Sequence, residues 1–129
     1  MSEKFTVEII SPDRLIIKSE ATEVTIPSYE GQMGILKDHI PLITFLRPGL
    51  IIIYGNEKKS YYVEEGTVEF SNNNLLILTS KAKVLENIDK KSLEEIKDLA
   101  KKKLNESEIS DKEKYLLSYK IETINEINQ

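Results

Sequence analysis

The side chains that could carry catalysis are few in this sequence, and their spacing favours no reaction. The chain of 129 residues contains one histidine, His39, and no cysteine. A histidine can act as a general base or a metal ligand, but no carboxylates stand at a ligand spacing from His39. The neighbouring glutamates in Glu64–Glu65 and Glu94–Glu95 point apart, so they predict no acid–base pair. We expect no catalytic site and no metal site, and a structural or surface role for His39.

Two other motifs match known ligand sites only in part. The sequence Gly31-Gln32-Met33-Gly34 is too short for a phosphate-binding loop, and no Lys-Ser or Lys-Thr pair follows it. The run Lys101–Lys103 is typical of a solvated helix face, and binding to a partner is the alternative. The net charge of −4 argues against binding to nucleic acid, which requires a clustered excess of basic residues.

The segment Ile26–Leu50 would position several of these residues, because its backbone is unusually constrained. Glycine can adopt positive φ and proline holds φ near −65°, so we expect a loop of fixed geometry with a glycine-rich turn at residues 30–34. The residues predicted to shape this loop are Gly31, Gly34, His39, Pro41, Pro48 and Gly49.

Short segments before and after this loop alternate between apolar and polar residues, as β-strands do. Phe5, Val7 and Ile9 would share one face of the first strand, and Pro27 is expected to end the third. The other predicted strands begin at Leu15 or cover residues 21–26, 43–46, 50–54, 60–63, 68–70, 75–78 and 82–85. Many short strands without intervening helices predict an antiparallel sandwich or barrel.

Near residue 86 the apolar spacing changes to three and four residues, which predicts helices. One stripe comprises Leu93, Ile96, Leu99, Ala100 and Leu104, and a second comprises Leu116, Leu117, Ile121, Ile124 and Ile127. Ser92 and Ser110 each precede a glutamate by three residues, which fits a capping box at each helix start. We therefore predict a mostly β, α+β fold, with a sandwich over 1–85 and a two-helix hairpin over 86–129.

The composition indicates a soluble protein with a real core. The hydrophobic share is 40%, and no apolar run approaches the roughly 20 residues that a membrane span needs. Because each helix carries a single apolar stripe, the hairpin buries little surface, so it could undock and bind elsewhere. A permanently docked hairpin is the alternative.

Several motifs in a fixed order point to one family. They are Val24–Pro27, Glu30–Leu36, His39, Pro41–Leu42, Pro48–Gly49, Tyr62–Val63 and Gly66–Glu69. In their order and spacing, and in the change to helices near residue 86, the whole chain resembles the epsilon subunit of bacterial F-type ATP synthase.

This resemblance implies a non-catalytic rotor subunit that couples the gamma subunit to the ring of c subunits. It implies a peripheral location on the cytoplasmic face of the bacterial cell membrane, with membrane contact only through the complex. The residues that would face the c ring are Tyr29, Glu30, Gly31, Gln32 and Met33. Some relatives carry a carboxylate where this chain has Gln32, so Glu30 is the expected charged partner.

The resemblance also implies that the hairpin regulates ATP hydrolysis. In its extended state it would reach the alpha and beta subunits and block rotation in the hydrolysis direction. The lysines Lys97, Lys101, Lys102 and Lys103 would attract an acidic segment of the beta subunits. The apolar residues Leu117, Ile121 and Ile124 would pack in the catalytic head.

No cofactor is expected. Several relatives bind ATP through a pattern resembling I-D-x-x-R-A at the start of the first helix. This chain matches only Ile88 and Asp89, because Ser92 replaces the arginine and no arginine follows Arg47. Lysines would have to replace bidentate guanidinium contacts to phosphate, so we expect ATP binding to be weak or absent.

The competing interpretation is a free-standing β-sandwich that binds a sugar or a peptide. Such a module would need exposed aromatic side chains over a groove, whereas this chain has no tryptophan and its tyrosines are scattered. An enzyme is a more distant third possibility.

Overall fold

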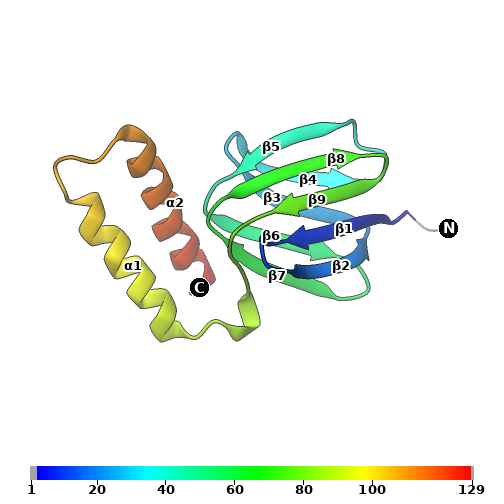
Figure 1. Ribbon diagram of the computed structural model, residues 1–129. Coiled ribbons are helices and arrows are strands. Elements are labelled where there is room, and N and C mark those ends of the chain that lie inside the picture. The colour runs from blue at the N-terminus through cyan, green and yellow to red at the C-terminus, as the bar shows by residue number, and fades with distance from the viewer. Residues whose placement is uncertain (1–2, 129) are drawn as a thin grey trace.

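Short strands followed by two helices make up the structure, which is a computed structural model that describes residues 3–128 (Figure 1). The strands are β1 (Phe5–Ile10), β2 (Leu15–Ala21), β3 (Glu23–Ser28), β4 (Gly31–Leu36), β5 (Leu42–Leu46), β6 (Gly49–Tyr54), β7 (Lys58–Val63), β8 (Gly66–Ser71), β9 (Asn74–Leu78) and β10 (Ala82–Val84). A short 3-10 turn, η1 (Leu85–Asn87), leads to the helices α1 (Lys90–Leu104) and α2 (Asp111–Ile127). The predicted fold class is confirmed.

The strands form two layers that join at one corner. One layer runs in the order β10-β7-β6-β3, with β4 paired to β3, and the other runs β5-β8-β9-β1-β2. The layers meet where Ser28 of β3 pairs with Leu46 of β5. Figure 1 shows the two layers face to face, with the helices beyond one end of the sandwich.

The core lies between the layers and follows the period-two pattern of the sequence. Phe5, Val7 and Ile9 of β1 are buried, as are Leu75 and Ile77 of the neighbouring β9. Because successive side chains of a strand point to opposite faces, every second residue of β1 reaches this core. Burying each such side chain contributes roughly 1.5–3 kcal/mol to folding.

The structure corrects the prediction for the central segment. Residues 31–36, Gly34 included, form strand β4 rather than a loop, and β3 continues through Pro27 to Ser28. A proline is tolerated inside β3 because β6 pairs only with Glu23–Thr25 and β5 only with Ser28. The true turn of this hairpin is Tyr29-Glu30, closed by Gly31 at a φ of 121°.

The loop after β4 is held by a reciprocal pair of hydrogen bonds. The Asp38 backbone N–H donates to Asn73 Oδ1 over 2.7 Å, and Asn73 Nδ2 donates to Asp38 Oδ1 over 2.9 Å. His39 follows, and its ring packs edge-on against Phe70 with 5.9 Å between the centroids. Pro41 is exposed beside it, just before β5. The contact with Phe70 is consistent with a structural role for His39 in this loop.

The helix starts are predicted correctly for α2 and incorrectly for α1. Ser110 caps α2, because its Oγ accepts the Glu113 N–H over 3.1 Å. In α1 the cap is Asp89 instead of Ser92, since Asp89 Oδ1 accepts the Ser92 N–H over 2.7 Å. An aspartate three residues earlier therefore takes the role given to Ser92. Leu99, placed in the apolar stripe, is 68% exposed.

We predict that Gly49→Ala destabilises the sandwich. A Cβ at position 49 would lie 2.4 Å from Cβ of the buried Pro27, so we expect a loss of about 1–3 kcal/mol in the free energy of unfolding. At position 34 a Cβ would meet only the flexible end of Glu23 at 3.3 Å, so Gly34→Ala should change stability by less than about 0.5 kcal/mol. Urea unfolding of both variants checks this. Equal losses would contradict the proposed contact.

Candidate functional site

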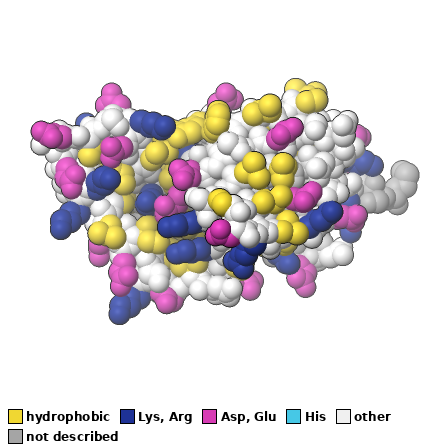
Figure 2. All heavy atoms as spheres, in the orientation of Figure 1, with side chains coloured by type: hydrophobic (Ala, Val, Ile, Leu, Met, Phe, Trp, Pro, Cys, Tyr) yellow, Lys and Arg dark blue, Asp and Glu magenta, His cyan; other side chains and the backbone are white. Residues whose placement is uncertain are grey.

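The outer face of the β5-β8-β9-β1 layer exposes an unusual amount of apolar surface. Ile43 and Phe45 alternate with buried residues along β5 and are 75% and 56% exposed, and Leu78 of β9 is 45% exposed. Figure 2 shows hydrophobic side chains gathered over β5 and the strands beside it. Contiguous exposed apolar surface of this kind marks sites of protein–protein contact.

The strand register makes this face continuous. Phe45 stands opposite Thr67, Thr67 opposite Leu78, and Leu78 opposite Ile10, so apolar residues cross most of the layer in one row. In the next row Ile43 and Leu76 flank Glu69. The register is fixed by hydrogen bonds between the strands, so the face is rigid and preformed.

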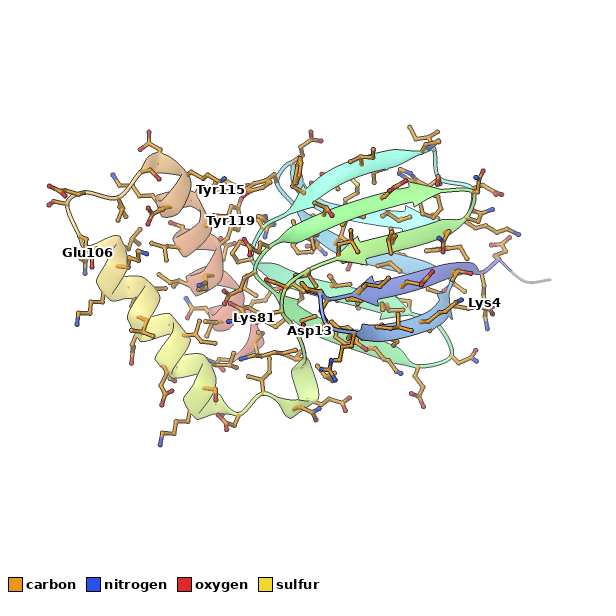
Figure 3. All side chains as sticks on the ribbon, in the orientation of Figure 1. Lys4, Asp13, Lys81, Glu106, Tyr115 and Tyr119 are labelled. Atoms are coloured by element: carbon orange, nitrogen blue, oxygen red, sulfur yellow. The ribbon has the colours of Figure 1, made fainter. Side chains whose placement is uncertain are left out.

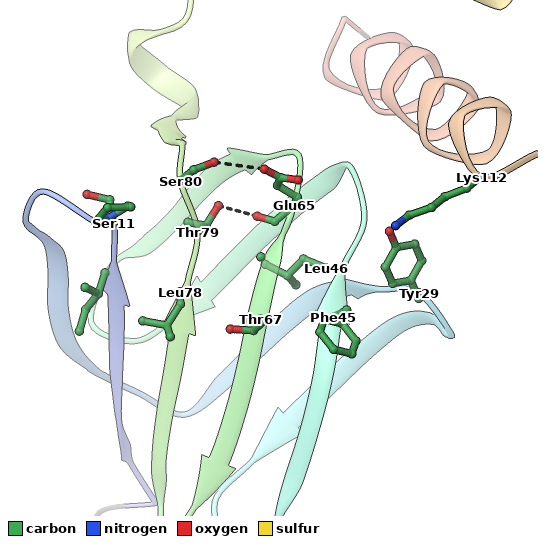
Figure 4. A pocket seen from close by; sticks show the side chains of 13 residues that line it. Ser11, Tyr29, Phe45, Leu46, Glu65, Thr67, Leu78, Thr79, Ser80 and Lys112 are labelled. Atoms are coloured by element: carbon green, nitrogen blue, oxygen red, sulfur yellow. Dashed lines mark hydrogen bonds between the residues drawn. The ribbon is translucent and has the colours of Figure 1, made fainter. Parts of the chain in front are cut away.

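A groove of about 940 Å³ lies where this face meets the helical end of the molecule. Its apolar lining comes from Ile10, Phe45, Leu46 and Leu78, and its polar lining includes Ser11, Glu65, Ser80 and Lys112. Figure 4 shows Lys112 reaching from α2 towards Tyr29 at one end of the groove. The Thr79 and Ser80 hydroxyls both donate to Glu65, to its backbone carbonyl and its carboxylate respectively, which fixes the rim. The sandwich and the hairpin thus both contribute to the groove.

Helix α2 docks on the end of the sandwich through polar and aromatic side chains. Tyr115 and Tyr119 point from α2 towards the strands (Figure 3). The Tyr115 hydroxyl donates to the Tyr29 carbonyl over 2.8 Å, and the two rings stack with 5.5 Å between their centroids. The hydroxyl of Thr123, buried in α2, donates to the Tyr119 carbonyl over 2.7 Å and lies 3.3 Å from the Pro48 carbonyl. Burial raises the pKa of the Tyr115 hydroxyl.

Charged groups add to this docking contact. The Arg47 guanidinium lies 3.8 Å from the centroid of the Tyr119 ring, and its Nη1 donates to the Pro48 carbonyl over 2.9 Å. Lys120 of α2 forms an ion pair with Glu64 of the sandwich at 3.2 Å. The Tyr62 hydroxyl donates to the same carboxylate over 3.0 Å. Burial, with the Glu64 carboxylate beside it, raises the pKa of Tyr62 well above its ordinary value.

The five residues predicted to face a c ring have different surroundings. Glu30 and Gln32 are exposed, on the turn and at the start of β4. Gly31 closes the turn, and Met33 is partly buried against the core. Tyr29 is engaged by Tyr115. Glu30 and Gln32 are therefore the polar side chains of this set that are available to a partner, and Tyr29 remains 36% exposed.

The start of α1 offers little to a nucleotide phosphate. Asp89 places a carboxylate at the helix N-terminus, where it accepts the Ser92 N–H that a phosphate would otherwise use. That hydrogen bond also lowers the pKa of Asp89. Ile88, the other residue matched to the nucleotide pattern, is half-buried beside it. Ser92, which stands where the nucleotide pattern has an arginine, offers no guanidinium group to a phosphate.

The hairpin residues predicted to act in an extended state divide into two groups. Lys101, Lys102 and Lys103 are exposed, and Lys103 forms an ion pair with Glu113 at 3.6 Å, whereas Lys97 is half-buried. Leu117 and Ile124 are buried and Ile121 is half-buried. At 100° per residue these apolar positions lie largely opposite Tyr115 and Tyr119, which suits packing against α1.

The apolar outer face and the docking residues were not predicted from the sequence. Ile43, Phe45 and Leu78 are exposed apolar residues within predicted strands, and alternation alone cannot tell which face meets solvent. Tyr115 and Tyr119 stand four residues apart on one helical face, which was the available signal for an aromatic contact. Arg47 gave no signal before the fold placed it beside Tyr119.

Residues 3–128 contain no cluster of three or more histidine, cysteine or acidic side chains that could hold a metal ion. Within the same range neither helix has the length and hydropathy needed to cross a bilayer.

Comparisons with known proteins agree with the fold. Residues 4–84 match the family model described as ATP synthase, Delta/Epsilon chain, beta-sandwich domain. The chain is 45% identical over 130 residues to the ATP synthase epsilon chain of Pelagibacter ubique (strain HTCC1062), covering 99% of this chain and all of that protein. It is 37% identical over 110 residues to the ATP synthase epsilon chain of Lawsonia intracellularis, covering 84% of this chain and 82% of that protein.

Two solved structures share the fold over nearly the whole chain. A chain of the Euglena gracilis mitochondrial ATP synthase structure, which contains OSCP, F1 and the c ring, matches 99% of this chain and 81% of its own length. Its TM-score is 0.78 at 21% identity. A chain from the central stalk and c ring of the Tetrahymena thermophila mitochondrial ATP synthase has a TM-score of 0.70 at 14% identity, with 99% and 98% coverage.

The burial of Tyr62, with the Glu64 carboxylate beside it, predicts a loss of stability at alkaline pH. The folded pKa of Tyr62 is raised above the ordinary value of 10.0, so above pH 10 the unfolded chain releases this proton first. The contribution of Tyr62 to stability is therefore fully present below pH 10 and is lost as the pH rises further. Urea unfolding at pH 8 and about pH 11 should show the decline, and Tyr62→Phe should make it shallower. An equally steep decline in Tyr62→Phe would contradict this assignment.

Proposed function

The chain belongs to the delta/epsilon chain family of ATP synthase, and we propose that within this complex it joins the gamma subunit to the c ring and restrains ATP hydrolysis. It is a non-catalytic subunit of the central stalk, the rotor. The observation that carries the proposal is the rigid apolar face of the sandwich, combined with a hairpin docked by mostly polar contacts. Such a subunit needs two parts. One is a rigid domain that binds the other rotor subunits, and the other is an arm that can detach.

The gamma subunit binds the outer face of the β5-β8-β9-β1 layer. Supporting this is the row of Phe45, Leu78 and Ile10, which is too apolar for a surface that faces only water. The groove at its end would seat an apolar ridge of a gamma helix. Phe45 is the expected anchor, since large aromatic side chains at the centre of an interface carry much of its binding energy.

The c ring is contacted by the turn after β3. Glu30 and Gln32 are exposed there and can accept or donate hydrogen bonds to polar loops of the c subunits. The turn is short and anchored, because the Glu30 N–H donates to Ser28 Oγ over 3.0 Å and the Tyr29 N–H donates to the Phe45 carbonyl over 3.0 Å. A turn that is already ordered loses little conformational entropy when it binds a partner.

The hairpin is the regulatory element, and the structure describes its docked state. In an extended state it would reach the alpha and beta subunits, with Lys101–Lys103 offering positive charge. Leu117, Ile121 and Ile124 would then exchange their partners in the docked hairpin for apolar surface in the catalytic head. The docked contacts are stacked rings, single hydrogen bonds and one ion pair, so the free-energy difference between the two states can be small.

The cellular location follows from the complex. The chain lies on the cytoplasmic face of the bacterial cell membrane and touches the membrane only through its partners. ATP binding is expected to be weak or absent, because Ser92 stands where the pattern has an arginine and no arginine follows Arg47. A free-standing module for sugars or peptides is not favoured, since Tyr29, Tyr115 and Tyr119 are used within the molecule.

Phe45→Glu is predicted to weaken binding to gamma by at least about tenfold, because it places a charge in the apolar row. Its melting temperature should stay near that of the wild type, since the side chain is 56% exposed. Leu36→Glu is the matched control, as Leu36 is 57% exposed but lies on β4 in the other layer. Surface-immobilised gamma would measure both affinities. A similar loss in both variants, or in neither, would refute the assigned face.

Removal of the hairpin is predicted to release hydrolysis. A chain truncated after Leu85 should remain folded and bind gamma, because the outer face and the core lie within the sandwich. ATP hydrolysis by the assembled enzyme should then rise, and Lys101–Lys103 replaced by glutamates should give part of that rise. Hydrolysis is measured under conditions in which the intact enzyme is restrained. Unchanged hydrolysis after truncation would show that the hairpin is not the brake.

A further inference from the structure

Aromatic side chains connect α2 to the turn after β3 in an unbroken series. The Tyr29 ring stacks on Tyr115 with an interplanar angle of 23°, and Tyr115 meets Tyr119 edge-on with 4.9 Å between the centroids. The Arg47 guanidinium covers the Tyr119 ring at 3.8 Å. Two of the four side chains belong to the sandwich and two to α2, so the series exists only while the hairpin is docked.

The series ends on a cation without a counter-charge. Arg47 forms no ion pair with a carboxylate in the part of the chain that the structure describes, and its Nε atom is buried there without a hydrogen-bond partner. Burying a cation with incomplete hydrogen bonding is costly. Arg47 is only half-buried and its Nη1 donates to the Pro48 carbonyl, so this cost is confined to the Nε atom, and the cation–π contact with Tyr119 offsets part of it.

Tyr29 belongs to two surfaces at once. Its ring and carbonyl hold Tyr115, and it directly precedes Glu30 in the two-residue turn. Ser28 is fully buried and bonds the Glu30 N–H, so the turn has little freedom to move independently of Tyr29. Glu30 and Gln32 remain exposed while the hairpin is docked. A partner can therefore bind the turn without displacing α2.

We propose that Tyr29 and Tyr115 form a latch through which a partner bound at the turn of residues 28–32 holds the hairpin on the sandwich. The partner is a polar loop of a c subunit that offers hydrogen-bond donors to Glu30, so this half of the inference rests on the proposed function. Docking fixes the ring and the carbonyl of Tyr29, the residue before Glu30, and a partner that contacts the turn in this arrangement binds the docked chain better. By linkage, the bound partner favours docking to the same extent.

The latch itself is tested in the isolated full-length chain by hydrogen exchange of the α2 amides. Tyr115→Phe removes the hydroxyl that donates to Tyr29 and should speed exchange in α2 by roughly three- to tenfold, the range expected for one hydrogen bond. Tyr29→Ala removes the stacked ring and should do the same. Tyr54→Phe is the control, because Tyr54 lies at the far end of β6 from Gly49, the end beside which α2 docks.

The double variant Tyr29→Ala/Tyr115→Phe should speed exchange by less than the product of the two single effects, because both changes remove parts of one contact. Exchange in the sandwich core should not change in any of the variants. Unchanged α2 exchange in both single variants, or strictly multiplicative effects, would overturn the latch.

The coupling is tested in the assembled complex with a turn variant, Glu30→Lys/Gln32→Lys. In the wild type, assembly should slow exchange at both the turn and α2, and the turn variant should lose both effects. Slowed exchange at the turn with unchanged α2 would overturn the coupling. Equal protection of the turn in the variant and the wild type would refute the c-ring contact. It would leave the latch, which is measured in the isolated chain, unaffected.

Discussion

The joint between β3 and β5 is the constraint on which the rest of the structure depends. Ser28 pairs with Leu46 there, and the Arg47 N–H donates to the Pro27 carbonyl over 2.9 Å. These bonds hold the two layers together at one corner. They also place two segments side by side, the turn that contains Tyr29 and the loop that contains Arg47. The surface on which α2 docks is thus a product of how the sandwich closes.

The same corner separates the two functional parts of the molecule, the apolar partner-binding face and the surface on which α2 docks. On one side of it the strand register fixes an apolar face that needs no movement to bind a partner. On the other side α2 is held by stacked rings, single hydrogen bonds and an ion pair to Glu64. Exposed ion pairs contribute at most about 1 kcal/mol, whereas the side chains of Lys120 and Glu64 are 24% and 36% exposed. The rigid part therefore suits permanent assembly, whereas the polar contact suits an arm that changes position.

Sequence patterns predicted the architecture well, because strands and helices follow from local periodicity. The buried series Phe5, Val7 and Ile9 and the Ser110 cap were found in this way. The prediction was wrong where tertiary pairing decides. Residues 31–36, which include two glycines, form a strand because β3 supplies hydrogen bonds to them. At the start of α1, Asp89 rather than Ser92 accepts a hydrogen bond from a free backbone N–H. The partners Tyr29 and Tyr115 are 86 positions apart, and no local pattern could bring them together.

The central claim is that the outer face of the β5-β8-β9-β1 layer is the gamma-binding surface. Photo-cross-linking from position 45 in the assembled complex tests it most directly, with a benzophenone amino acid in place of Phe45 and, separately, in place of Leu36. Our account predicts a covalent adduct between this chain and gamma from position 45 and none from position 36. An adduct with gamma from position 36 alone would contradict it, because it would place gamma on the opposite layer.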